Sequence, residues 1–152
     1  MRIALGADHA GVQAKQLLRE ALASAGHEVS DLGTQGEASV DYPDFAQAVA
    51  RAVADGRAER GVLICGTGIG MCISANKVEG IRAAKVNDPY EAKMSRQHND
   101  ANVICFGARV IDPSVMLESA RVFLETPFEG GRHARRVEKM MHPQPSQGAT
   151  GC

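Results

Sequence analysis

The stretch that decides the fold is Gly61-Val62-Leu63-Ile64-Cys65-Gly66-Thr67-Gly68-Ile69-Gly70. Residues 61–65 form an uninterrupted apolar run, which is typical of a central parallel strand buried on both faces. The glycines that follow at alternate positions allow a tight turn, because glycine adopts backbone conformations that other residues avoid. The stretch therefore predicts a buried strand, a turn and a short helix over about residues 70–77.

Similar apolar runs alternate with helical patterns along the rest of the chain. Further strands are expected at residues 2–7, 27–32, 81–86 and 103–106, and helices at 12–25, from 43 onward, 89–97, 113–124 and 131–141. The first helix has an expected buried stripe of Val12, Leu17, Leu18, Ala21, Leu22 and Ala25. This alternation predicts an α/β fold, a Rossmann-like three-layer α/β/α sandwich with a five-stranded parallel sheet.

Length and composition limit the domain organisation and the class of protein. The chain has 152 residues, a formal net charge of -1 and 44% hydrophobic residues. We expect one domain over residues 1–141 and a flexible tail over 142–152. A chain so nearly neutral is not expected to bind nucleic acid, and no apolar run reaches the roughly 18–20 residues that cross a membrane.

The N-terminus and the cysteines indicate the cellular compartment. Residues 1–8 lack the apolar core and the cleavage site of a signal peptide. The cysteines, Cys65, Cys72, Cys105 and Cys152, fit no zinc-binding spacing. We therefore expect a cytoplasmic protein with reduced thiols and without a bound metal.

In open parallel sheets, ligands bind beyond the carboxyl ends of the strands, near a point where the strand order reverses. This rule selects four segments: 7–9, 65–70, 86–88 and 107–109. The turn over 65–70 carries the strongest signal, since its backbone N–H groups and the following helix N-terminus offer a positive cradle. Such a cradle binds a phosphate or stabilises an oxyanion during a reaction.

Two other interpretations of this turn stay open from the residues alone. A dinucleotide site follows the pattern G-x-G-x-x-G, but Met71 stands where the last glycine would be. Asp88 does follow the next strand, where such a site would place a ribose ligand. The remaining possibility is a turn with a purely structural role.

Cys65 makes the turn a candidate for catalysis. Its thiol stands at the carboxyl end of a strand and faces a helix N-terminus, whose positive end favours the thiolate. A thiolate can act as a base or as a nucleophile near neutral pH. The alternative is an inert buried cysteine, which is the expected state of Cys72 and Cys105.

Three polar residues elsewhere are candidate partners of Cys65. Asp8 and His9 follow the first strand and therefore lie at the same edge of the sheet, although either could simply cap the next helix. His98 is expected in a polar loop, where most histidines are surface residues. Histidine is nevertheless the side chain that titrates nearest to neutral pH.

Arg132 and Arg136 are four residues apart in a helical stretch and therefore share one face. They form a basic cluster with His133 and Arg135. On its own the cluster fits a solvated helix face, but planar guanidinium groups also suit a phosphate. Arg109, just past the fifth strand, could join this group.

These stretches together resemble the ribose-5-phosphate isomerase B family, which also contains the galactose-6-phosphate and allose-6-phosphate isomerases. The matching segments follow one another along nearly the whole chain: Gly6-Ala7-Asp8-His9-Ala10-Gly11, Asp41-Tyr42-Pro43, the 65–70 turn, Ser74-Ala75-Asn76-Lys77, Gly80-Ile81-Arg82-Ala83, 95–103, Phe106-Gly107-Ala108-Arg109 and Glu129-Gly130-Gly131-Arg132-His133. The resemblance implies an isomerase that interconverts D-ribose 5-phosphate and D-ribulose 5-phosphate through an enediolate, in the non-oxidative pentose phosphate pathway. It also implies no cofactor, and a homodimer or dimer of dimers with active sites shared between subunits.

The resemblance assigns a role to each matching residue. Cys65 would be the base that moves a proton between C1 and C2, in the branch of the family that uses a thiol instead of a glutamate. His98 would be the acid that opens the furanose ring, and Thr67 would assist Cys65 or hold a hydroxyl. The substrate contacts would come from Asp8, His9, Gly66, Thr67, Gly68, Ile69, Gly70, Asn99, Arg109, Arg132 and Arg136, with the arginines at the phosphate.

Two alternatives to this function stay open. The first is an isomerase of a six-carbon phosphosugar, either allose 6-phosphate or galactose 6-phosphate. The galactose enzyme of the family uses two unlike subunits, whereas this chain has both Cys65 and His98, which favours a homomer. The second is a non-catalytic module that binds a nucleotide or phosphate. Met71-Cys72-Ile73 departs from the family pattern after the glycine turn, a departure that could alter helix packing.

Overall fold

The strands form where the apolar runs predict them. β1 (Arg2–Ala7), β2 (Glu28–Asp31), β3 (Arg60–Cys65), β4 (Ala83–Lys85) and β5 (Val103–Gly107) make up one sheet in which all neighbouring strands are parallel. The strand order is β2-β1-β3-β5-β4, so β3 lies in the middle. This computed structural model describes residues 1–144 of the chain. The predicted five-stranded parallel sheet is confirmed.

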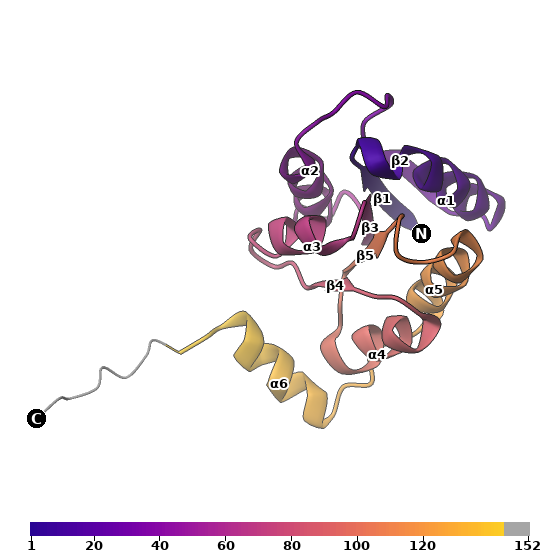
Figure 1. Ribbon diagram of the computed structural model, residues 1–152. Helices are drawn as coiled ribbons and strands as arrows, with labels where there is room; N and C mark the ends of the chain where they lie inside the picture. The colour runs from indigo at the N-terminus through magenta and orange to yellow at the C-terminus, as the bar shows by residue number, and fades with distance from the viewer. Residues whose placement is uncertain (145–152) are drawn as a thin grey trace, which may run out of the picture.

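Helices cover both faces of the sheet (Figure 1). They are η1 (His9–Gly11), α1 (Val12–Ser24), α2 (Tyr42–Ala54), α3 (Ile69–Ala75), α4 (Pro89–Asn99), α5 (Pro113–Glu125) and α6 (Arg132–Met141). The side chains of α1, α4 and α5 join the apolar core on one face, and those of α2 and α3 join the core on the other. The three-layer α/β/α sandwich is therefore confirmed.

The central strand β3 serves both cores, because successive side chains of a strand point to opposite faces. Val62 and Ile64 belong to the core beneath α1 and α5, while Leu63 and Cys65 belong to the core beneath α2 and α3. All four are buried. This double burial is the physical reason for the uninterrupted apolar run, and it leaves Cys65 as the last buried residue before the glycine turn.

The helix α6 differs from the other helices because it does not cover the sheet. It packs against α4 and projects away from the body of the molecule (Figure 1). His133 is its one buried residue between Arg132 and Met141. Because α6 buries so little surface, few contacts within its own chain stabilise it.

The buried stripe of α1 differs from the predicted one. The helix buries Leu18 and Leu22 as expected, but its third buried residue is Lys15, and Leu17 is 46% exposed. The prediction was wrong at Leu17, Ala21 and Ala25, which are exposed, because it rested on the spacing of apolar residues alone. Lys15 lies three and seven residues before Leu18 and Leu22, so the true stripe contains a charged residue.

His98 was expected in a loop but belongs to the last turn of α4. The helix begins at Pro89 after Asp88, whose carboxylate caps it, and continues to Asn99. It ends because Asp100 adopts a left-handed conformation with a φ of 45°. Arg96 and Arg82 hold the Asp100 carboxylate at 2.7 and 3.0 Å, which stabilises this ending.

The C-terminal part of the structure bears on two further expectations. The last helix stops at Met141, where the predicted domain ends, but a single domain over 1–141 stays a prediction. The expected flexible tail, 142–152, lies outside the described residues from 145 onward. Within residues 1–144, no helix combines the length and the apolar character needed to cross a bilayer.

Candidate active site

Three of the selected segments meet at the carboxyl edge of the sheet. Ala7 pairs with Ile64 and Cys65 pairs with Gly107, so β1, β3 and β5 end side by side. The Asp8 N–H donates to the carbonyl of Ile64 at 3.3 Å, and the Ala108 N–H donates to that of Cys65 at 2.8 Å. The strand order reverses between β1 and β3, so this edge has the features of a ligand site in an open sheet.

The glycine turn brings its backbone close to the Cys65 thiol. The Gly68 N–H donates to the Cys65 Sγ at 3.1 Å, and the Ile69 N–H donates to the Thr67 Oγ1 at 3.3 Å. Gly68 has a φ of 79°, and a side chain there would lie 2.8 Å from the Phe106 backbone. The sequence therefore needs glycine at this position, and the turn directs the first N–H groups of α3 toward one region.

Tyr42 belongs to this edge and was not among the predicted site residues. Its ring covers Gly70, since a Cβ there would come within 2.7 Å of the ring carbons and 3.1 Å of the Oη. Tyr42 opens α2, with Pro43 as the next residue, and its side chain remains 41% exposed. In the sequence, only the family resemblance of the Asp41-Tyr42-Pro43 segment pointed to Tyr42, and the resemblance assigned no role to this residue.

Asp8 and His9 lie beside the glycine turn with their orientations fixed. The Asp8 carboxylate accepts the Ala10 N–H at 2.9 Å, so Asp8 does cap η1, and it is only 6% exposed. The His9 Nδ1 accepts the Val40 N–H at 3.2 Å. Neutral His9 therefore carries its proton on Nε2, where it can donate a hydrogen bond.

The remaining predicted residues lie at the opposite edge. Because α4 runs back from the carboxyl edge to the start of β5, its last residues, His98 and Asn99, lie at the amino edge of the sheet. The N-terminus of α6 is held there too, since the Glu129 N–H donates to the Gln97 carbonyl at 3.1 Å. Arg132 and Arg136 are exposed on α6.

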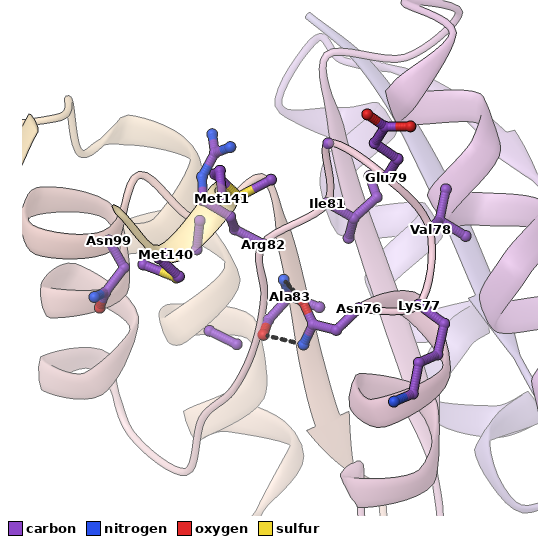
Figure 2. A pocket seen from close by; sticks show the side chains of 13 residues that line it. Asn76, Lys77, Val78, Glu79, Ile81, Arg82, Ala83, Asn99, Met140 and Met141 are labelled. Carbon is purple, nitrogen blue, oxygen red and sulfur yellow. Dashed lines mark hydrogen bonds between the residues drawn. The ribbon is translucent and has the colours of Figure 1, made fainter. Parts of the chain in front are cut away.

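The predicted site is thus divided into two groups within one chain. The carboxyl-edge group contains Asp8, His9, Cys65, Gly66, Thr67, Gly68, Ile69, Gly70 and Arg109. The amino-edge group contains His98, Asn99, Arg132 and Arg136. Asn99 also lines a cavity of about 590 Å³ between the end of α6 and residues 76–84, which Figure 2 shows together with Met140 and Met141.

His98 has two partners at the amino edge. Its ring stacks on that of His133 with centroids 4.2 Å apart and an interplanar angle of 10°. The Glu129 carboxylate lies 3.8 Å from the Nε2 of each ring. Burial lowers the pKa of His133, and the neighbouring His98, Arg132 and Arg136 lower it further, against the opposing effect of Glu129. The neutral form of His133 is therefore favoured.

His98, Glu129 and His133 also form the one group of potential metal ligands found among residues 1–144, with ligand atoms within 4.8 Å of one another. In this arrangement the stacked rings are nearly parallel, so their lone pairs do not converge on one point. A metal ion needs lone pairs that do converge. The group therefore fits a metal poorly unless His98 turns.

The two cysteines expected to be inert differ from each other. Cys105 is fully buried, and burial raises the pKa of its thiol well above the usual range. Cys72 is partly exposed, and the hydrogen bond with Cys105 lowers the pKa of its thiol to about 7. The expected burial is therefore confirmed for Cys105 and wrong for Cys72, while the inertness of both thiols stays a prediction.

Comparisons with known proteins agree with this architecture. A family model described as Ribose/Galactose Isomerase matches residues 3–140. Ribose-5-phosphate isomerase B of Escherichia coli is 47% identical over 137 residues, which cover 90% of this chain and 92% of that protein. D-erythrulose-4-phosphate isomerase of Pectobacterium atrosepticum is 46% identical over 142 residues, which cover 92% and 93%.

A solved structure, that of ribose-5-phosphate isomerase B from Clostridium thermocellum, superimposes with a TM-score of 0.92. It is 49% identical and covers 93% of this chain and 95% of its own. The range that the family model matches, residues 3–140, contains both the carboxyl-edge and the amino-edge groups.

Proposed function

The chain belongs to the ribose/galactose isomerase family, and we propose that it interconverts D-ribose 5-phosphate and D-ribulose 5-phosphate. It is an isomerase whose substrate is a sugar phosphate. The observation that carries the proposal is the Cys65 thiol at the glycine turn, within 3.1 Å of the Gly68 N–H. A six-carbon substrate and a non-catalytic binding module are not favoured by the relatives.

The carboxyl-edge group suits proton transfer between two neighbouring carbons. Cys65 removes the proton from C2 of the open-chain aldose and returns it to C1 of the enediolate, while the hydroxyl proton on O2 passes to O1, so that C1 becomes the alcohol carbon and C2 the carbonyl carbon. The negative charge that develops on oxygen is stabilised by backbone N–H groups of the glycine turn and of the start of α3. Thr67, whose Oγ1 accepts from Ile69, lies beside this path and can hold a substrate hydroxyl.

We infer that a second copy of the chain completes the site. His98 and Arg132 of one chain stand at the amino edge, away from the Cys65 of the same chain. The surface around the glycine turn carries exposed apolar side chains, Ile69 at 54% and Ile73 at 57%, which a partner would cover. In the assembled dimer, His98 opens the sugar ring while Arg132 and Arg136 bind the phosphate.

The setting of the reaction follows from the substrate. We propose a cytoplasmic enzyme of the non-oxidative pentose phosphate pathway, in agreement with the partly exposed thiol of Cys72, which reducing conditions preserve. The chemistry needs a base, an acid and oriented N–H donors. The residues of the two groups supply all three.

The substrate assignment is tested by comparing kcat/KM for several sugar phosphates. The panel consists of ribose 5-phosphate, allose 6-phosphate, galactose 6-phosphate and erythrulose 4-phosphate, the last because of the relative in Pectobacterium atrosepticum. We expect ribose 5-phosphate to give a kcat/KM at least about tenfold above the others, since one misplaced group costs on that order. A higher value for any other substrate would overturn the assignment.

A further inference from the structure

Lys15 is a charged residue inside the apolar core. It lies on the buried stripe of α1 with Leu18 and Leu22, and only 2% of its surface is exposed. An ammonium group is retained in such a place only when it is paired and hydrogen-bonded. The role of Lys15 therefore depends on the groups that its Nζ contacts.

Those groups lie where β2 leaves the sheet. The Lys15 Nζ donates to the Asp31 Oδ1 at 2.8 Å and to the Thr34 carbonyl at 2.7 Å, and the Gly33 N–H donates to the same Oδ1 at 3.0 Å. Burial acts to raise the pKa of Asp31, but the bonds from Lys15 and Gly33 together lower it. Asp31 is therefore ionised, and the contact is a buried ion pair.

The ion pair fixes the backbone that follows β2 against the end of β1. The Leu32 N–H donates to the Leu5 carbonyl at 2.8 Å, and the Thr34 N–H donates to the Ala7 carbonyl at 3.0 Å. The approach at Gly33 is tight, since a Cβ there would lie 2.6 Å from the Ala7 nitrogen and 2.9 Å from the Lys15 Cδ. The segment thus reaches the residue that precedes Asp8.

The loop over residues 33–40 then ends on His9. The Val40 N–H donates to the His9 Nδ1 at 3.2 Å, which keeps the proton of neutral His9 on Nε2. One end of the loop is held by Lys15 and the other end holds His9. The middle of the loop, residues 35–39, is exposed, so the contacts that hold the loop lie at its two ends.

We propose that the Lys15–Asp31 ion pair is a positioning device for His9. It fixes the loop over 33–40, which in turn sets the ring orientation and the tautomer of His9. His9 then presents an Nε2–H donor, which suits a phosphate or hydroxyl oxygen of the substrate. That last step rests on the proposed function, while the link from Lys15 to His9 does not.

The direct test replaces the ion pair by an apolar pair of similar size, Lys15→Met with Asp31→Leu. Such replacements often preserve stability, so the double variant separates positioning from folding. We expect KM to rise about tenfold with kcat changed less than about threefold, the effect of one lost hydrogen bond to substrate. Lys93→Met, on the exposed face of α4, is the matched control and should leave both constants unchanged.

Two measurements on the free protein test the link without any substrate. The ¹⁵N chemical shifts of His9 report its tautomer, and hydrogen exchange reports the protection of the Val40 amide. In the double variant we expect a mixture of His9 tautomers and Val40 exchange at least about tenfold faster. Unchanged His9 shifts and Val40 exchange would overturn the proposal, whether or not the protein isomerises ribose 5-phosphate.

Val40→Pro provides a second test that does not depend on the folding of the double variant. It removes the N–H that bonds to His9, in a partly exposed loop, and leaves Lys15 and Asp31 in place. Proline also fixes φ at residue 40 and restricts residue 39, so the His9 shifts are measured together with KM. We expect the same rise in KM and the same change in the His9 shifts. A wild-type KM in Val40→Pro would contradict the proposed path from the loop to His9.

Discussion

The carboxyl-edge group and the amino-edge group are built in different ways. Cys65 and Asp8 are 5% and 6% exposed and are held by backbone hydrogen bonds at the ends of buried strands. The His98 side chain is 40% exposed, and Arg132 lies on a helix that projects from the molecule. One chain therefore holds the proposed proton-transfer half of the site in place, whereas we propose that the half that binds phosphate is completed by assembly.

The largest effect should come from the carboxyl-edge group. We expect Cys65→Ala to lower kcat by about a thousandfold or more, because the base is lost while the N–H cradle remains. Cys72→Ala is the control, since Cys72 is partly exposed and has no place in the proposed chemistry. Steady-state kinetics of both variants suffices, and a Cys65→Ala enzyme that keeps its turnover would sink the assignment of the base.

A smaller effect on a different constant should come from the amino-edge group. We expect Arg132→Ala and Arg136→Ala each to raise KM by about ten- to a hundredfold with less effect on kcat, since each removes a charge-assisted contact to phosphate. Arg135→Ala, on the same exposed helix, is the control and should behave as the wild type. Equal KM values for the Arg135 and Arg132 variants would argue against a phosphate contact at Arg132.

The smallest expected effect is on the Tm of the protein at acidic pH, and it depends on Asp31. The folded protein lowers the pKa of Asp31 below its usual 3.8, so the ion pair with Lys15 stabilises the fold above that pH. This stabilisation is lost as the pH falls through the lowered value. We expect the Tm of the wild type to fall more steeply than that of Asp31→Asn below about pH 4. Parallel Tm profiles for the two proteins would show that Asp31 does not contribute.

Much of the carboxyl-edge group could be predicted because local patterns determine it. The apolar run before Cys65 and the glycines after it act within a few residues, and parallel strands bring Asp8 and Cys65 to one edge. Lys15 and Tyr42 could not be found in this way. Their roles depend on contacts with Asp31 and Gly70, which are distant in the sequence.

The division of the predicted site residues into two groups has a signal in the order of helices and strands. His98 follows a helix and precedes β5, and a helix between parallel strands must return to the amino edge. That topology alone separates His98 from Cys65. The side-chain stack of His98 on His133 had no such signal, because it depends on how α6 packs against α4.

The most direct test of a site shared between two chains mixes two inactive variants. Cys65→Ala lacks the base and His98→Asn lacks the acid, so each homodimer should be nearly inactive. If each site combines the two edges of different chains, a mixed dimer contains one intact site, and random pairing should restore about a quarter of the wild-type activity. Mixed dimers as inactive as the two parents would contradict the account.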